Sequence, residues 1–280
     1  MRVGIFTNCN KDVDLSVTKR LNALLVAADF DVLLHKDIVS KGISGKCFDE
    51  SRDNKIDVML TVGGDGTILK IASYCAKFDM AILGINLGHI GFLTEIEINA
   101  IDTIPELLLQ KKLVSEKRSL LCAETGGKIY YGLNDVVLSR DNVERMIGVM
   151  VEVDGRLADK YSCDGYIVCT PTGSTAYSLS AGGCILSPEA RAMALVPINS
   201  HSLHSRPIVV SDDAKIEISL ISSSDSCSVI VDGQCMGQVK TNDKLSVKKA
   251  DKELVFLRLK DSNFYEKLLS KLNTWSVTLK

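Results

Sequence analysis

The stretch IDVMLTVGGDGT, residues 56–67, decides how the first part of this chain folds. It begins with Ile56–Val62, a mostly apolar and β-branched run that is typical of a strand buried on both faces. Three glycines follow within the next four residues and let the backbone turn tightly and approach a ligand closely. Because ligands of open α/β sheets gather at the carboxyl ends of strands, and a helix start attracts anions, this stretch predicts a phosphate-binding turn.

Asp65 is the residue of this turn that indicates a catalytic role. A carboxylate beside phosphates is repulsive unless Mg²⁺ bridges the two or the carboxylate has a proton to accept. In a kinase both conditions hold, because Mg²⁺ accompanies the phosphates and the attacking hydroxyl has a proton to give up. The alternative is that Asp65 or Thr67 only caps the helix that follows, which is an ordinary role for either residue type.

The first hundred or so residues alternate strand-like and helical patterns on either side of this turn. The predicted strands are Arg2–Thr7, Asp31–His35, Ile56–Val62 and Ala81–Ile85, and the predicted helices are Val13–Ala28 and Ile68–Ala76. Such alternation predicts an α/β domain with a parallel, Rossmann-like sheet covered on both faces.

From Ser119 the pattern changes to short alternating runs separated by turn signals such as Gly126-Gly127 and Asp154-Gly155. The predicted strands are Leu120–Glu124, Lys128–Gly132, Val136–Ser139, Gly148–Val153, Ile167–Thr170, Ala214–Leu220, Ser228–Val231, Lys244–Lys249 and Glu253–Leu259. This pattern predicts a mainly β domain over 119–259, after an α/β domain over 1–118. Helical spacing returns in the tail, 260–280, which is expected to pack back on the body of the protein.

The composition excludes several classes of function. The 280 residues carry a formal net charge of -2, so no overall field attracts nucleic acid or an anionic membrane. No apolar run approaches a membrane span, and the N-terminus is too short in apolar residues for a signal peptide, which predicts a cytoplasmic protein. The nine cysteines are scattered singly, as expected of reduced thiols.

Two other glycine-containing segments are set aside as nucleotide motifs. In Gly42–Lys46 the glycines are too close together for a P-loop, so this segment is interpreted as a surface turn. Gly84–Gly91 follows a strand but does not have the G-x-G-x-x-G spacing of a dinucleotide fingerprint.

A second cluster, Thr170–Gly183, has the sequence TPTGSTAYSLSAGG directly after a predicted strand. Its hydroxyls and backbone N–H groups are candidate donors near a helix start, and Tyr177 is a candidate wall for a flat ring. The alternative is a Ser/Thr-rich turn whose hydroxyls cap a helix.

Together these motifs resemble those of bacterial-type NAD kinases. The resemblance rests on GGDGT at 63–67, GHIGFLTE at 88–95, Asn134-Asp135 and the Thr170–Gly183 block, with further similarity at VDGQ, 231–234, in Pro197–Pro207 and at Phe264, Tyr265, Leu272 and Trp275. It spans almost the whole chain. It implies ATP-dependent phosphorylation of the adenosine-ribose 2′-hydroxyl of NAD to give NADP, by a homo-oligomer that is usually a tetramer.

The resemblance also implies roles for single residues. Asp65 matches the family's proton acceptor. The residues implied in binding ATP phosphates are Gly63, Gly64, Gly66 and Thr67. The residues implied in binding NAD are Asp65, Gly66, Phe92, Asn134, Asp135, Arg145, Asp164, Thr175, Ala176, Tyr177, Ser180 and Gln234. Mg²⁺ is expected to arrive with ATP, without a metal site built from protein side chains, and inorganic polyphosphate is an alternative donor.

Each of these positions also has a simpler interpretation. Asn134-Asp135 is compatible with a turn before a strand, and Arg145 with a solvated surface charge. Asp164-Gly165 and Asp232-Gly233 are compatible with hairpin turns. Ser162 stands where many relatives have Arg, and Cys184 where Pro is frequent, but neither departure touches the expected chemistry. Lys and Arg are absent from both motif cores, which predicts that a metal ion and backbone dipoles neutralise the phosphates.

Two rival functions use the same motifs. A lipid kinase shares GGDGT, but it would need an apolar or basic membrane-facing surface, and the sequence contains no basic amphipathic helix. A non-catalytic dinucleotide sensor would bind NAD or NADP without consuming ATP. Asp65 argues against the sensor, since a carboxylate contributes nothing to the mere binding of phosphates.

Overall fold

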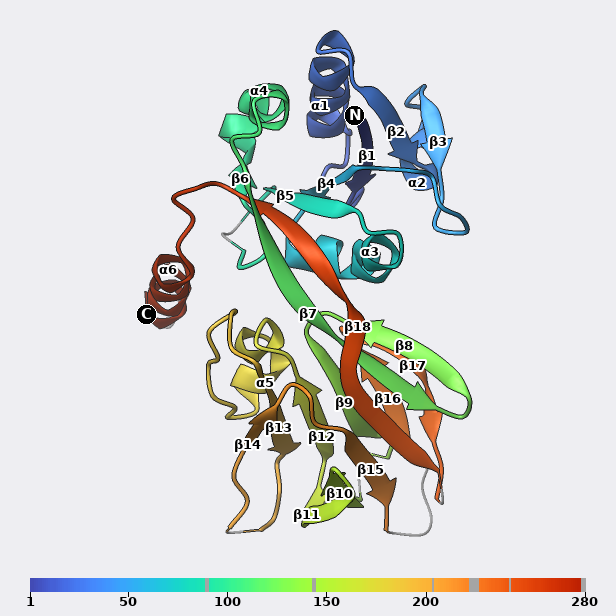
Figure 1. The fold of residues 1–280 in the computed structure, drawn as a ribbon, viewed down its shortest axis with the longest axis vertical. Coiled ribbons are helices and arrows are strands. Elements are labelled where there is room, and N and C mark those ends of the chain that lie inside the picture. Colours follow the sequence, from blue (N-terminus) through green and yellow to red (C-terminus); the bar gives the residue numbers. More distant parts are fainter. Residues whose placement is uncertain (89–90, 143–144, 203, 222–226, 242, 278–280) are drawn as a thin grey trace. The chain divides into compact units, whose positions relative to one another are not determined.

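A computed structural model describes residues 1–88, 91–142, 145–202, 204–221, 227–241 and 243–277. The chain divides into two compact units, coloured by sequence in Figure 1. Unit 1 comprises Met1–Lys117 and Leu254–Lys280, and unit 2 comprises Arg118–Glu253. The divisions fall within two long strands, β7 (Val114–Thr125) and β18 (Lys244–Arg258).

Unit 1 contains a parallel sheet with the strand order β3-β2-β1-β4-β5. The short strand β6 and the end of β18 pair with β5, also in parallel. The central strands β1, β4 and β5 are buried along almost their whole length, as expected of a parallel sheet covered on both faces. The strand bounds are β1 (Arg2–Thr7), β2 (Asp31–His35), β3 (Lys46–Phe48), β4 (Val58–Gly63), β5 (Ala81–Asn86) and β6 (Ile96–Glu97).

The helices of unit 1 are α1 (Ser16–Ala27), α2 (Lys36–Val39), α3 (Asp65–Lys77), α4 (Ile104–Leu109) and α6 (Phe264–Val277), with a 3-10 helix, η1, at Ile98–Thr103. Two helices and a helical tail were predicted in unit 1, and α2, α4 and η1 were not. The first helix begins at Ser16 and not at Val13, because the Asp12 carboxylate accepts hydrogen bonds from the N–H groups of Val17 and Thr18 at 3.3 and 2.9 Å. The second begins at Asp65, inside the glycine-rich turn.

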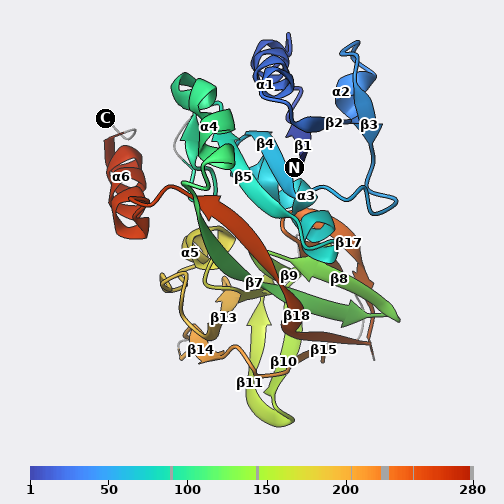
Figure 2. The same ribbon diagram turned by 45° about the horizontal axis from the view of Figure 1, so that its top comes forward.

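Unit 2 is built of antiparallel strands. One sheet has the order β14-β13-β12-β9-β16-β17, and a second group has the order β11-β10-β15-β18. β7 and β8 form a hairpin, which Figure 2 shows as two neighbouring arrows. The remaining bounds are β8 (Lys128–Gly132), β9 (Asp135–Arg140), β10 (Ile147–Val153), β11 (Arg156–Cys163), β12 (Gly165–Cys169), β13 (Ala192–Ile198), β14 (Ile208–Ser211), β15 (Ile216–Leu220), β16 (Cys227–Val231) and β17 (Gln234–Val239), with a 3-10 turn η2 (Gly173–Thr175) and a short helix α5 (Tyr177–Ser180).

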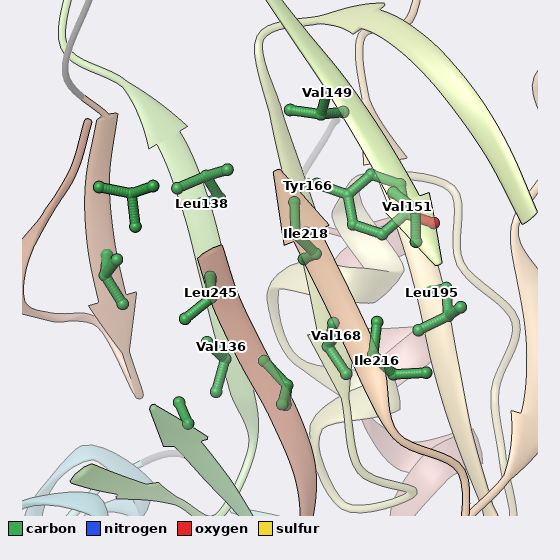
Figure 3. Packing of buried hydrophobic residues seen from close by; sticks show 14 of the residues in the cluster. Val136, Leu138, Val149, Val151, Tyr166, Val168, Leu195, Ile216, Ile218 and Leu245 are labelled. Carbon is green, nitrogen blue, oxygen red and sulfur yellow. The ribbon is translucent and has the colours of Figure 1, made fainter. Parts of the chain in front are cut away.

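The core of unit 2 lies between these two groups of strands (Figure 3). Every second residue of β10, β15 and β16 is buried, so each strand turns one face to this core. The cluster includes Leu138 of β9 and Tyr166 of β12, together with Val149 of β10 and Ile218 of β15. β12 is buried on both faces, because residues of β9, β12 and β13 form a second apolar cluster.

The predicted fold class is confirmed: an α/β region with a parallel sheet is followed by a mainly antiparallel β region. The tail forms α6, which contacts residues of unit 1. Two strands predicted in 244–259 are one continuous strand, β18. Six described strands were not predicted: β3, β6, β11, β13, β14 and β17. None of the helices in the described part of the chain is long and apolar enough to cross a membrane.

Candidate functional site

The glycine-rich turn connects the end of β4 to the start of α3. Gly64 is the N-cap residue, and its N–H donates to the Thr67 hydroxyl at 3.3 Å, so Thr67 does cap the helix. Gly63 has no room for a side chain, because a Cβ added there would overlap Thr67 Oγ1. The capping alternative is therefore right for Thr67, whereas Asp65 makes different contacts.

The Asp65 carboxylate accepts three consecutive backbone N–H groups, an arrangement named here the Asp65 collar. Phe92 N donates to Oδ2 at 2.8 Å, and Leu93 N and Thr94 N donate to Oδ1 at 3.1 and 3.3 Å. A Cβ added at Gly91 would overlap Asp65 Oδ1, so the close approach of the two segments depends on this glycine. A carboxylate has about four lone-pair sites, and the collar leaves one of them, on Oδ2, open to another donor.

Buried charges hold the other side of segment 92–95. Arg258 Nη1 donates to Leu93 O at 2.7 Å and to Glu95 Oε2 at 3.1 Å, and Lys267 Nζ lies 2.6 Å from Glu95 Oε2. Burial would raise the pKa of Glu95, but the hydrogen bond and charge of Lys267 and the charge of Arg258 outweigh it and lower this pKa. The segment that donates to Asp65 is thus held on its other side by the ionic cluster of Arg258, Glu95 and Lys267, in which the charges of opposite sign are paired.

A cavity of about 410 Å³ opens beside the start of α3 and the end of β1. Asn8, Thr67, Lys41 and Lys70 are among the residues that line it. Lys11 is also close, since its Nζ lies 3.2 Å from the position that a Cβ on Gly64 would occupy. The motif itself contains no Lys or Arg, but lysines outside it lie beside the turn (Lys11) and line the neighbouring cavity (Lys41 and Lys70).

Unit 2 contains a second collar of the same kind, named here the Asp232 collar. Asp232 Oδ2 accepts Leu133 N at 2.7 Å, and Oδ1 accepts Asn134 N at 2.7 Å and Asp135 N at 3.2 Å. Asp232 also has a positive φ of 48°, and with Gly233 it forms the predicted hairpin turn between β16 and β17. Asp232 therefore fixes the Asn134-Asp135 pair as well as making a turn.

The two acids of this region repel each other. Asp135 is only 5% exposed, and burial together with the Asp232 charge raises the pKa of Asp135 to about 7. Burial also raises the pKa of Asp232, although its three N–H donors oppose the shift. At neutral pH, Asp135 can therefore carry a proton and act as a hydrogen-bond donor.

The Thr170–Gly183 block packs directly against the Asn134-Asp135 turn. Thr170 N donates to Asn134 O at 2.9 Å, and the Thr170 hydroxyl donates to Leu133 O at 2.6 Å. A Cβ on Gly173 would overlap Asn134 O, so only glycine fits there. Two segments chosen separately from the sequence are thus neighbours in the structure.

Not all of the block's hydroxyls are available to a ligand. Ser174 Oγ donates to Pro171 O at 2.6 Å, and Thr172 Oγ1 accepts from Arg118 at 3.1 Å. The expected helix start is a 3-10 turn followed by the one-turn helix α5. Tyr177 is 49% exposed, Ser180 is exposed, and Thr175 and Ala176 are partly exposed.

The remaining predicted residues occupy separate places. Asp164 accepts from Arg140 and from Asn199, both at 3.0 Å, and it connects two strands that pair with different neighbours, so the hairpin interpretation of Asp164-Gly165 is wrong. Arg145 and Gln234 are exposed. His89 and Ile90 of the GHIGFLTE segment lie outside the described residues, as does Leu203 of Pro197–Pro207, and the side chain of Trp275 is not described.

Sequence reasoning missed Asp232, Lys11 and Arg258 as contributors to these sites. Asp232 was noted as part of an Asp-Gly turn and of the similar stretch VDGQ, but neither signal gave its side chain a role. Lys11 and Arg258 lie outside the motifs, and no local pattern distinguishes them from other basic residues.

The chain is similar to known proteins along almost its whole length. Residues 3–113 match the model of the ATP-NAD kinase N-terminal domain, and residues 133–259 match that of the ATP-NAD kinase C-terminal domain. The NAD kinase of Carboxydothermus hydrogenoformans is 39% identical over 275 residues, covering 94% of this chain and 97% of that protein. The NAD kinase of Thermoanaerobacter sp. (strain X514) is 36% identical over 278 residues, covering 97% and 98%.

Solved structures show the same fold. An NAD kinase from Archaeoglobus fulgidus in complex with ATP has a TM-score of 0.77 and 27% identity, covering 98% of this chain and 99% of that one. Yeast NADH kinase complexed with NADH has a TM-score of 0.86 at 22% identity, covering 98% and 87%, and is similar in fold. The matched models and relatives span both units, and this chain belongs to the NAD kinase family.

Proposed function

We propose that this protein transfers the γ-phosphoryl group of ATP to the adenosine-ribose 2′-hydroxyl of NAD, giving NADP and ADP. The observation that carries the proposal is the Asp65 collar, in which three N–H donors fix a carboxylate at the start of α3 and leave one lone-pair site on Oδ2. Membership of the NAD kinase family is the reason for proposing ATP and NAD as substrates. The Asp65 carboxylate, held by the collar, is the group proposed to act on the 2′-hydroxyl of NAD.

Asp65 is the proton acceptor in this proposal. The 2′-hydroxyl donates a hydrogen bond to the open site on Oδ2 and its oxygen attacks the γ-phosphorus in line. As the new P–O bond forms, the proton passes to Asp65 and the bond from the γ-phosphorus to the β,γ-bridging oxygen breaks, releasing ADP. The collar keeps the carboxylate from rotating, which lowers the reorganisation needed in the transition state.

The phosphate donor is assigned to unit 1. The proposed phosphate-binding residues Gly63, Gly64, Gly66 and Thr67 lie at the start of α3. The N–H groups of Gly64 and Thr67 are used within the cap, so the anion is expected to meet other N–H groups of the first turn, such as that of Gly66. Lys11 lies beside Gly64, and Lys70 lines the neighbouring cavity, so two cations are available to the polyphosphate chain. Residues 1–118 with 260–280 therefore form the donor-binding domain of this proposal.

Magnesium belongs to the proposal through the donor. Among the described residues, no three His, Cys, Asp or Glu side chains form a group able to hold a metal ion. The collar also leaves Asp65 with little capacity as a ligand. Mg²⁺ commonly binds through substrate phosphates and water with few protein ligands, and it is proposed to bind here with ATP. Bound in this way, the ion neutralises the phosphate oxygens.

The dinucleotide is assigned chiefly to residues 119–259. Asn134 and a protonated Asp135 can donate hydrogen bonds to the acceptors of NAD, and the exposed ring of Tyr177 can stack on a base. The other proposed NAD contacts are Phe92, Arg145, Asp164, Thr175, Ala176, Ser180 and Gln234. We also propose a cytoplasmic homotetramer, on the basis of the family resemblance, and sedimentation of the pure protein tests the assembly.

The deciding experiment incubates the pure protein with Mg-ATP and NAD and detects the product with an NADP-specific dehydrogenase. Formation of NADP, with phosphate located at the 2′ position by NMR, is the expected result. Parallel incubations replace NAD by NADH and ATP by polyphosphate, and omit Mg²⁺. Binding of NAD without any phosphorylated product would contradict the proposal and favour a sensor.

A further inference from the structure

A lysine of the C-terminal helix lies next to the Asp65 collar. Lys271 Nζ is 3.8 Å from Asp65 Oδ2 and 4.5 Å from the centre of the Phe92 ring. The two side chains of this ion pair are only 23% and 27% exposed. A cation over an aromatic face and near a carboxylate is attracted by both, so Lys271 has a defined place.

The helix α6 is fixed where it presents this lysine. Lys267 precedes Lys271 by one turn, lies 2.6 Å from Glu95 Oε2 and donates to Thr94 O at 3.3 Å. The Phe264 ring contacts the Phe92 ring with a centroid distance of 6.1 Å. Residues four apart lie on the same helix face, so the anchoring of Lys267 directs Lys271 to the same segment.

The contacts of the two Asp65 oxygens are unequal. Oδ1 accepts two N–H groups of the collar, whereas among the described residues Oδ2 accepts only Phe92 N. Lys271 is nearest to Oδ2, and at 3.8 Å it attracts this oxygen without forming a short hydrogen bond. The cation therefore lies close to the oxygen that has a free lone pair, and does not fill it.

The geometry points to Lys271 as a positioning residue for phosphoryl transfer, one that aligns Asp65 Oδ2 and offsets its negative charge where the donor phosphates must approach. This inference rests on the proposed function, since it assigns Lys271 an effect only through Asp65. Repulsion between the Asp65 carboxylate and the phosphates is greatest as the 2′-oxygen and the γ-phosphorus come together, so a cation that offsets it acts on kcat more than on KM.

Lys271→Met tests the inference, with Lys271→Arg as the conservative variant and Lys260→Met as a control that removes an equal charge at an exposed position nearby. We expect Lys271→Met to lower kcat by about 10- to 100-fold. Loss of a group that contacts the reacting atoms directly typically costs about 100- to 1,000-fold, and Lys271 acts only through Asp65. KM for NAD and for ATP stays within about twofold, and Lys271→Arg recovers most of kcat. The thermal midpoint is expected to be that of the unchanged protein.

Three results would overturn the inference: an unchanged kcat in Lys271→Met, an equal loss in Lys260→Met, or a loss accompanied by a lower thermal midpoint and not recovered by arginine. A raised KM for ATP with kcat retained would also overturn it, because Lys271 would then bind the donor directly. All four results presuppose that the unchanged protein forms NADP. Failure of that first assay removes the proposed function itself, and so is distinguishable from failure of this inference.

Discussion

The Asp65 collar and the Asp232 collar have the same hydrogen-bond arrangement, but the charged side chains beside them have opposite sign. Each carboxylate accepts three consecutive backbone N–H groups from a segment remote in sequence. Asp65 has the cation of Lys271 as its neighbour, whereas Asp232 has another acid, Asp135, which is buried. The N–H groups fix a carboxylate in either case, and the neighbouring charge decides what it can then do.

This difference assigns the collars to different tasks. Near Asp65 the positive neighbour suits a carboxylate that meets phosphates, and one lone-pair site remains for a hydroxyl. Near Asp232 the second acid is driven towards its neutral form, so the pair anchors a turn and offers a proton as a donor. The first collar is expected to matter for rate and the second for stability.

The largest expected effect is on catalysis by Asp65→Asn. Its amide oxygen can still accept from Leu93 and Thr94, but its NH₂ group faces Phe92 N–H and cannot accept a proton. We expect kcat for NADP formation to fall by about 1,000-fold, within the range of general acid–base catalysis, with the dissociation constant for NAD little changed. Steady-state kinetics and calorimetry measure the two quantities.

Asp232→Asn is the matched control, since it changes the same atoms in the other collar. It should leave most of kcat intact. If Asp65→Asn keeps more than about a tenth of the activity, below the usual contribution of general bases, Asp65 is an anchor like Asp232 and the comparison fails.

The second effect is on stability through Asp232→Ala. Three partly buried N–H groups lose their acceptor, and the left-handed turn residue is replaced by one that disfavours this backbone. The free energy of unfolding should fall by about 3 kcal/mol, as expected for unsatisfied buried donors. Urea denaturation followed by circular dichroism measures the change. Asp232→Asn should lose clearly less, since asparagine tolerates the turn and retains one oxygen, and equal losses would contradict the role of the carboxylate.

The third effect is a dependence of stability on pH that comes from Asp135. Its pKa is raised from 3.8 to about 7 in the folded protein, so between these values the folded state holds a proton that the unfolded state has lost. Folding is therefore favoured at low pH, and this contribution is lost as pH rises from about 4 to about 7. Asp135→Asn imitates the protonated acid and removes the contribution.

The measurement compares Asp135→Asn with the unchanged protein at pH 5 and pH 8. The difference in unfolding free energy should move in favour of the variant by about 3 kcal/mol, since the roughly two pH units between pH 5 and the folded pKa correspond to about 1.4 kcal/mol each. A difference that is constant with pH would show that Asp135 is charged in the folded protein throughout this range, and the contrast between the two collars would then disappear.

A strand could be predicted from the sequence where its own residues carry a clear pattern, and not where its formation depends on distant parts of the chain. β1 and β2 have the predicted bounds, because their apolar runs are short and end at clear changes of pattern. β11 and β17 were not predicted, since most residues of β11 and half of those of β17 are exposed, and neither strand shows a clean alternation. β13 contains Pro197 within an apolar run, and proline argues against a strand with neighbours on both sides.

The candidate site shows the same limit. Asp65, Asn134-Asp135 and the Thr170 block form recognisable motifs, so they could be chosen from sequence alone. The groups that orient them are far along the chain: the Asp232 collar joins residues 97 to 99 positions apart, and Lys271 comes from the last helix. An Asp-Gly turn or a helical lysine has no local feature that reveals such a contact.

The smallest expected effect is that of Gly91→Ala on kcat, and it tests the difference between the two collars at the glycine beside Asp65. A Cβ on Gly91 would overlap the Asp65 carboxylate, a side chain that can move aside, and so Gly91→Ala should displace Asp65 without unfolding unit 1. We expect kcat to fall by about tenfold, equivalent to about 1.4 kcal/mol in the barrier, with little change in the thermal midpoint. Gly88→Ala is the control, because a Cβ there meets no atom of the described residues within 4 Å.

The corresponding glycine of the other site should behave differently. A Cβ on Gly173 would overlap the backbone of Asn134, which cannot rotate away, so Gly173→Ala should lower the thermal midpoint before it lowers kcat. Opposite orders of effect in the two alanine variants would confirm that one glycine protects a reacting carboxylate and the other a packed turn. If Gly91→Ala instead destabilises the protein and leaves kcat per folded molecule unchanged, the Asp65 collar is also a structural anchor, and its difference from the Asp232 collar would lie only in the charge of the neighbour.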